Sequence, residues 1–242
     1  SFAAAVSGDG NHVVFLSNAS NLVPGDLNNR QDVFFHDRLT GVTSRVSIDS
    51  TTLEGDGDSF DPAVSEDGRH VAFTSQASNL VAGDTNGVSD VFVHDRQTGV
   101  TSRVSVDSTG LEGNDPSFTP ALSSDGRYVA FTSAATNLVA NDTFTDTDIF
   151  VHDRLTGTTS RVSVSGTGLE GNDDSGLPSI SADGRYVAFT SYASNLVAGD
   201  TFTDTDIFVH DRQTGATGRI SIASAGAEGN AWCPTRSSIS PD

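Results

Sequence analysis

Acidic and amide side chains recur at alternate positions in a loop that the chain repeats four times. The second copy reads NLVAGDTNGVSD over residues 79–90. Alternate side chains of a tight loop can converge on one point, and Ca²⁺ accepts six to eight oxygen ligands of this kind. The sequence therefore predicts one calcium site per loop, with the following ligands: Asp26, Asn28 and Asp32; Asp84, Asn86 and Asp90; Asp142, Asp146 and Asp148; Asp200, Asp204 and Asp206.

A plainer interpretation of these loops is that Asp and Asn make side-chain turns in a solvated connection. Calcium is preferred because the loops of copies two to four carry several acids and no cation, so their self-repulsion needs compensation. Adaptation to high salt would also explain an acidic surface. It is less favoured because the acids are placed by the repeat and Glu is scarce.

A histidine recurs at one position of a β-type run, next to an aspartate. This pattern invites a metal-binding or catalytic interpretation, but equivalent positions in different repeats are splayed apart, so a structural role is expected. No GxSxG elbow or other nucleophile arrangement stands out. The sequence therefore favours a protein that is not an enzyme. The histidines are His36, His94, His152 and His210.

The elements that must position these residues follow a repeat. Turns of the SxDG type begin at Ser7, Ser65, Ser123 and Ser181, always 58 residues apart. Within the second copy, four short runs rich in Val, Phe and Thr are bounded by turn residues: FDPAVS, HVAFTS, DVFVHD and TSRVSVD. Four strands per period without a helical pattern predict an all-β protein, a β-propeller of four-stranded antiparallel blades.

Two strings carry a family resemblance, SADGRYVAFTS (181–191) and DVFVHDRQTG (90–99). They resemble the TolB-type, WD-like β-propeller repeat in a long-period bacterial version. The resemblance implies the propeller fold. It leaves the activity open, because such propellers serve as binding scaffolds, as partners of hydrolase domains and as parts of surface proteins.

Strand parity orients the connections. With the four strands of a blade running up and down in turn, the loop 79–90 and the crossover 109–118 must lie on the same side of the propeller. Both segments are acidic, so this side should be strongly negative. On the opposite side, Asp95 is expected to cap the tight turn that follows its strand, and Asp37, Asp153 and Asp211 to do the same.

The net charge limits the classes of partner that the protein can bind. The chain has 13 Lys+Arg and 32 Asp+Glu, which gives −19. This field opposes binding to nucleic acid or to an anionic membrane, both of which need clustered cations. No apolar run approaches the ~18 residues of a spanning helix, so direct membrane insertion is not expected. The single cysteine excludes an intrachain disulfide.

The two ends of the chain raise the question of ring closure. The repeats divide into blades of about 1–58, 59–116, 117–174 and 175–233, and a surplus inner-type strand at 234–242 follows. Three interpretations stay open: a four-bladed ring with a tail, a piece of a larger ring or array, and a terminal strand that pairs with a neighbouring molecule and could build a fibre. Trp232 and Cys233 lie in the divergent last crossover and are either an interface anchor or a hydrophobic plug.

We therefore expect a single propeller domain that acts as a non-enzymatic, calcium-stabilised bacterial scaffold, located outside the cell, at its surface or in the periplasm. Its partners would be an unknown protein or glycan ligand, or further copies of itself through the terminal strands. The alternative class is an enzyme, a lyase or a hydrolase-associated propeller, with a site at the central face.

Overall fold

The computed structural model describes residues 2–201, 204–224, 229 and 238–239. These residues form four antiparallel sheets of four strands, each sheet in simple chain order. The first sheet is β1 (Phe2–Val6), β2 (His12–Ser17), β3 (Asp32–Asp37) and β4 (Thr43–Arg45). The second is β5 (Ser59–Val64), β6 (His70–Ser75), β7 (Asp90–Asp95) and β8 (Val100–Arg103). The third is β9 (Ser117–Leu122), β10 (Tyr128–Ser133), β11 (Asp148–Asp153) and β12 (Thr158–Arg161). The fourth is β13 (Ser175–Ile180), β14 (Tyr186–Ser191), β15 (Asp206–Asp211) and β16 (Ala216–Arg219).

Each sheet is one blade of a propeller, as the sequence predicted. The two central strands of the second blade pair without interruption, from His70 opposite Asp95 to Ser75 opposite Asp90. The inner strand is less regular, because its register against the second strand shifts between Phe60 and Ala63. Asp61 lies at this irregularity with φ of 47°, and it places an ionisable side chain on the inner strand of the second blade.

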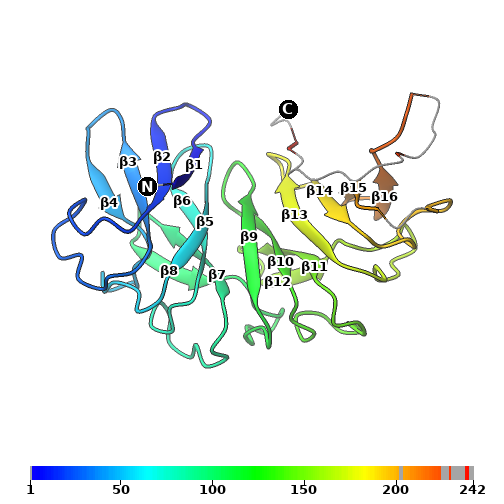
Figure 1. Ribbon diagram of the computed structural model, residues 1–242, viewed down its shortest axis with the longest axis horizontal. Helices are drawn as coiled ribbons and strands as arrows, with labels where there is room; N and C mark the ends of the chain where they lie inside the picture. The colour runs from blue at the N-terminus through cyan, green and yellow to red at the C-terminus, as the bar shows by residue number, and fades with distance from the viewer. Residues whose placement is uncertain (1, 202–203, 225–228, 230–237, 240–242) are drawn as a thin grey trace.

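The blades follow one another along an arc whose two ends are β1 and β13 (Figure 1). The inner strands make contact in the order β1, β5, β9 and β13. Among the strands that the structure describes, no comparable contact joins β1 to β13. The described blades therefore form an open arc, and the interpretation as a closed four-bladed ring does not apply to them.

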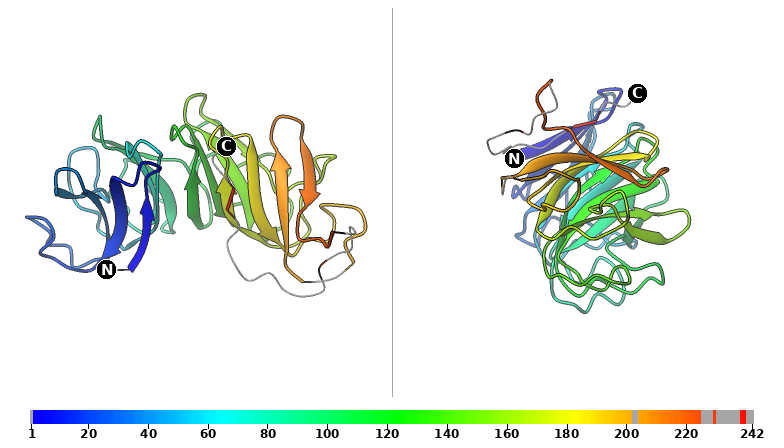
Figure 2. Two further views of the ribbon diagram at one scale, coloured as in Figure 1. Left: turned by 90° about the horizontal axis from the view of Figure 1, so that it is seen from above. Right: turned by 90° about the vertical axis from the view of Figure 1, so that its right-hand side faces the viewer.

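The core lies between successive blades, which stand side by side when the molecule is seen from above (Figure 2). Between the second and third blades, Val91, Val93 and Val104 pack against Phe131 and Leu138, and all five side chains are at most 1% exposed. Successive side chains of a strand point to opposite faces, so one blade can use both faces for such contacts. The alternating apolar pattern of the repeat therefore positions the blades as well as forming them.

No segment of the described residues forms a helix that could cross a membrane.

Candidate acidic clusters and an axial pocket

A buried carboxylate anchors each acidic loop to the outer strand of its own blade. Asp90, the first residue of β7, is fully buried, and the Ser105 hydroxyl donates a 2.5 Å hydrogen bond to it. The same hydroxyl accepts a hydrogen bond from the Val91 amide at 3.1 Å. The pairs Asp32 with Ser47, Asp148 with Ser163 and Asp206 with Ser221 repeat this arrangement.

The carboxylates of the second blade gather around an arginine. Nη1 of Arg103 lies 3.4 Å from Asp84 Oδ1, 3.2 Å from Asp90 Oδ2 and 2.7 Å from Glu112 Oε2. Oxygen atoms of these three acids lie within 4.8 Å of one another, close enough to hold a metal ion. Because the arginine side chain is only 8% exposed, its charge acts on the acids with little screening by solvent.

The third blade repeats the cluster. Nη1 of Arg161 lies 3.3 Å from Asp142 Oδ1, 3.0 Å from Asp148 Oδ2 and 2.7 Å from Glu170 Oε1. Asp142 Oδ1 is buried and has no hydrogen bond of good geometry within the described residues. We call these two groups the second and third acidic clusters.

In both clusters the surroundings of the loop aspartate disfavour its ionised form. Burial, followed by the Asp90 charge, raises the pKa of Asp84 to about 6. Burial, followed by a hydrogen bond with Glu170, raises the pKa of Asp142 to about 7. The glutamates behave differently, because hydrogen bonds from Thr85 and Thr143 lower the pKa of Glu112 and Glu170. With three carboxylates and one guanidinium, each cluster has a negative formal charge and attracts a further positive charge, either a proton or a cation.

The predicted calcium ligands are only partly brought together. Asp84 with Asp90, and Asp142 with Asp148, share a cluster, whereas Asp146 lies outside it. In the first blade, Arg45 contacts Asp26, Asp32 and Glu54, and in the fourth Arg219 contacts Asp200 and Asp206. Among the described residues, oxygen atoms of three acids lie within 4.8 Å of one another only in the second and third blades. Asp204 is exposed and belongs to neither of those two clusters.

The two predicted amide ligands have a different role. Nδ2 of Asn86 donates to Asp90 Oδ2 and to the Gly113 carbonyl, both at 2.9 Å, so this nitrogen and not the amide oxygen faces the cluster. Asn28 makes the same two bonds to Asp32 and Gly55. These residues fasten the loop to the crossover, which confirms that the two segments lie on the same side.

Sequence reasoning missed the arginine and the glutamate of each cluster. Both recur in every complete repeat, the arginine at the end of the outer strand and the glutamate nine residues later in the EG dipeptide. That regular spacing was the available signal. The loops of copies two to four contain no cation of their own, but in the folded protein the outer strand supplies one to each cluster.

On the opposite side, the turn aspartates behave as expected and also bind an arginine. Asp95 accepts from the Gln97 amide, which caps the turn, and from Arg69 through two bonds of 2.9 and 2.6 Å. The Arg69 contact lowers the pKa of Asp95. The adjacent His94 is buried, and its Nδ1 lies 2.9 Å from the Thr101 hydroxyl, which itself donates to the Ile48 carbonyl. A hydroxyl held in this way is not free to act as a nucleophile, so the geometry agrees with a structural histidine.

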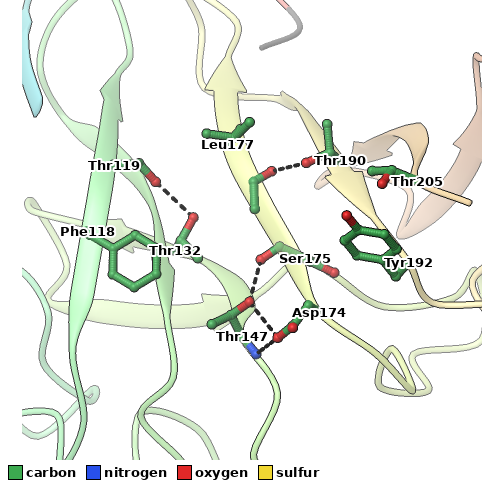
Figure 3. A pocket seen from close by; sticks show the side chains of 11 residues that line it. Phe118, Thr119, Thr132, Thr147, Asp174, Ser175, Leu177, Thr190, Tyr192 and Thr205 are labelled. Atoms are coloured by element: carbon green, nitrogen blue, oxygen red, sulfur yellow. Dashed lines mark hydrogen bonds between the residues drawn. The ribbon is translucent and has the colours of Figure 1, made fainter. Parts of the chain in front are cut away.

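A pocket of about 260 Å³ opens between the third and fourth blades near the inner strands (Figure 3). Phe118 and the half-exposed Tyr192 supply aromatic surface. Asp174 supplies a carboxylate, one oxygen of which accepts hydrogen bonds from the amide and hydroxyl of Thr147 at 2.7 and 2.9 Å. The hydroxyls of Thr119 and Thr132 lie 2.9 Å apart on the other wall.

The pocket coincides with departures from the repeat. Tyr192 stands where the three preceding repeats have Ala134, Gln76 and Asn18, and Gly176 and Leu177 stand where the third repeat has Phe118 and Thr119. Asp174 replaces Pro116 of the preceding repeat, but the second repeat has Asp58 at this position, and it accepts a hydrogen bond from the Gln31 amide as Asp174 does from the Thr147 amide. The pocket is therefore a local specialisation of this blade pair.

The predicted interface residues Trp232 and Cys233 lie outside the described residues. So does the surplus strand 234–242, apart from Ser238 and Ile239, which have no regular secondary structure.

Comparison with known proteins supports the fold. No family model matches the sequence, and no curated protein does. The structure is similar to TolB from Acinetobacter baumannii, with a TM-score of 0.55 and 20% identity over 90% of this chain and 43% of that one. A putative TolB from Agrobacterium tumefaciens has a TM-score of 0.56 and 17% sequence identity, over 89% of this chain and 63% of that one.

The structure is also similar to a protease domain. The β-propeller domain of the trilobed protease from Pyrococcus furiosus, which has an open velcro topology, gives a TM-score of 0.52 and 14% identity, over 87% of this chain and 54% of that one. The chain thus has the propeller fold of TolB and of peptidase propeller domains. It spans less than two thirds of the length of these three structures.

Proposed function

We propose that this protein is a non-enzymatic binding scaffold whose ligand site is the pocket between the third and fourth blades. The observation that carries the proposal is Tyr192, which gives this pocket an aromatic ring at a position where the other repeats have Asn18, Gln76 and Ala134. Aromatic surface beside hydroxyls and one carboxylate suits a neutral, polyhydroxylated ligand, since a sugar ring can stack on Tyr192 while its hydroxyls bond to Asp174. We infer a glycan as the ligand, encountered outside the cell or in the periplasm.

The absence of a catalytic arrangement supports a scaffold over a lyase or hydrolase. Within the described part of the chain, the histidine on the third strand of each blade is bonded to a threonine hydroxyl, as in the pairs of His94 with Thr101 and His152 with Thr159. Burial lowers the pKa of both histidines, so they are neutral near pH 7. The pocket itself is lined by no histidine or cysteine.

A glycan microarray probed with the labelled 242-residue chain tests the proposal. We expect retention of neutral oligosaccharides, and its loss in Tyr192→Ala and Asp174→Ala. Tyr192→Ala installs the residue that the preceding repeat carries at this position, so the blade should fold. Leu155→Ala, at an exposed turn on the opposite side, is the control. No retained glycan, or equal retention by all variants, would contradict a glycan site, and shortened products would favour an enzyme.

Calcium is the ion that we propose for the second and third acidic clusters. The support is an all-oxygen ligand set in each cluster, together with loop aspartates whose pKa values are raised, chiefly by burial and then by the neighbouring acids. The ion must compete with Arg103 or Arg161 for the same oxygens. We therefore expect weak binding, with a dissociation constant of about 10⁻⁴–10⁻³ M, as in extracellular calcium modules.

Thermal melting at pH 7.5 tests the calcium proposal. Millimolar Ca²⁺ should raise the melting temperature above that in chelator, and Mg²⁺ should have a smaller effect, because Mg²⁺ gives up its water ligands reluctantly. An unchanged melting temperature in Ca²⁺ would overturn it. Pairing of the terminal strand 234–242 with a neighbouring copy remains a separate prediction for the chain's partners.

A further inference from the structure

Three interfaces join the four blades, and they share one composition. We call the surface by which a blade contacts the following blade its forward face, and the opposite surface its backward face. Three apolar side chains of each forward face are at most 1% exposed: Val33, Phe35 and Val46; Val91, Val93 and Val104; Ile149, Val151 and Val162. Three side chains of each opposing backward face are at most 2% exposed: Val71, Phe73 and Leu80; Val129, Phe131 and Leu138; Val187, Phe189 and Leu196.

The forward face of the fourth blade carries the same kinds of side chain without that burial. Ile220 is 52% exposed, whereas Val162 at the equivalent position of the third blade is 1% exposed. Ile207 and Val209 are partly exposed, although their equivalents in the other three blades are fully buried. This end of the arc therefore presents an apolar surface that the chain elsewhere covers with a blade.

The backward face of the first blade is left open in the complementary way. Val13, Phe15 and Leu22 are partly exposed, and their equivalents in the other blades are buried. The two faces lie at opposite ends of the arc (Figure 1), so one chain does not bring them together in the described blades.

Hydrogen bonds that join neighbouring blades are also missing at the two ends of the arc. The hydroxyls of Thr101, Thr159 and Thr217 each donate to a carbonyl of the preceding blade. Thr43, the equivalent residue of the first blade, bonds to His36 of its own blade and to no carbonyl of another blade within the described residues. At the other end, the buried Thr205 hydroxyl has no hydrogen bond among the described residues, whereas its equivalent Thr147 bonds to Asp174 of the next blade.

A cation stacks across each interface where an aromatic ring is available. The Arg96 guanidinium lies 3.1 Å from the centre of the Phe35 ring, and Arg212 lies 4.5 Å from that of Tyr128. Arg38 is the first blade's equivalent of these arginines, and it is exposed. Tyr186 is the fourth blade's equivalent of Tyr128. Arg38 at one end of the arc and Tyr186 at the other are therefore the two residues that one further cation–aromatic contact needs.

We propose that a second copy of this chain docks head to tail, with the forward face of its fourth blade against the backward face of the first blade. The occupant is a copy of this chain because the two open faces match the pair of faces that already pack three times within it. Arg38 would then stack on Tyr186 of the other copy. Such an interface is heterologous, so it builds a closed ring if the rotations sum to a full turn and a filament if they do not.

Analytical ultracentrifugation of the 242-residue chain over a wide concentration range tests the proposal. We expect species of at least twice the 25.1 kDa mass. Higher salt should favour them, because it screens repulsion between chains of charge −19. Val13→Asp and Ile220→Asp each place a charge in one open face and should each give monomers. Leu155→Asp, at a turn residue that is 74% exposed, is the matched control and should assemble like the wild type.

Mixing the two charged variants is the decisive step. Each retains one intact face, so the equimolar mixture should give a 1:1 dimer that cannot grow, while circular dichroism shows that both variants are folded. A wild-type chain that stays monomeric, single variants that still assemble, or a mixture that stays monomeric would overturn the proposal. Removal of residues 234–242 separates docking from terminal-strand exchange: retained assembly supports docking, and lost assembly overturns it.

Discussion

Replacing Arg161 with glutamine should expose how strongly the third acidic cluster depends on its one cation. The guanidinium Nη1 contacts Asp142, Asp148 and Glu170 at 3.3, 3.0 and 2.7 Å, and the arginine side chain is 8% exposed. Removing one partner from a buried ion pair costs about 3–5 kcal/mol, because the remaining charge is left without compensation. For a chain of this size, that loss corresponds to a fall in melting temperature of roughly 6–20 °C.

The pH dependence of this loss distinguishes electrostatics from packing. Without Arg161, the three carboxylates repel one another, so their folded-state pKa values rise above those of the unfolded chain. Groups shifted in this direction add stability as pH falls, so the destabilisation should be largest near pH 8 and smaller near pH 5. Glutamine keeps most of the side-chain volume, so a packing defect would give a loss that does not change with pH.

Urea unfolding monitored by circular dichroism at both pH values measures the effect. Arg127→Gln is the matched control, because Arg127 pairs with a single acid, Asp153, and its side chain is 35% exposed. It should cost about 1 kcal/mol. Ca²⁺ should stabilise Arg161→Gln more than the wild type, since the competing guanidinium is gone. Equal stability of Arg161→Gln and the wild type at pH 8, or a loss of the same size at both pH values, would refute the reasoning.

Two further substitutions use the same measurements. Asp142→Asn should stabilise the protein by up to about 4 kcal/mol at pH 8 and by nothing below about pH 4, because the cost of ionising a carboxyl whose pKa rises from 3.8 to about 7 is lost with it; a stabilisation that persists at pH 4 would point to another cause. Thr159→Val should cost about 1–3 kcal/mol, because the Val106 carbonyl and the His152 ring lose their partner. Thr43→Val, measured in dilute protein, should cost less than half as much, and equal losses would show that no carbonyl bond distinguishes the two threonines.

The fold could be predicted from the sequence because each blade is a local product of the chain. The first three strands of the second blade lie within one residue of the predicted runs 60–65, 70–75 and 90–95. The fourth predicted run, 101–107, extends beyond the outer strand, which ends at Arg103. The turns of this blade are set by short-range chemistry, such as the bond from the Gln97 amide to Asp95 two residues earlier. Such contacts form between residues close in sequence, and the patterns that predict them recur in each of the four 58-residue repeats.

The acidic cluster was predictable only in part. The alternation within 79–90 correctly brought Asp84 and Asp90 together, because both belong to one short loop. It could not identify Arg103 or Glu112, which lie 13 and 22 residues beyond Asp90 on another strand and a crossover. Their meeting depends on how the outer strand and the crossover fold back over the loop, and the sequence pattern carries no direct measure of that packing.

What the sequence determined by itself was the blade, its turns and the negative charge of one side, because periodicity, turn residues and charge are read residue by residue. What only the tertiary structure decided was the partner of each charge and the openness of the arc. Each of the two acidic clusters has at its centre an arginine that is distant from the loop in sequence, Arg103 in the second blade and Arg161 in the third. The two end faces, identical in pattern to buried ones, are exposed because burial depends on the presence of a neighbouring blade and not on the residues of the face itself.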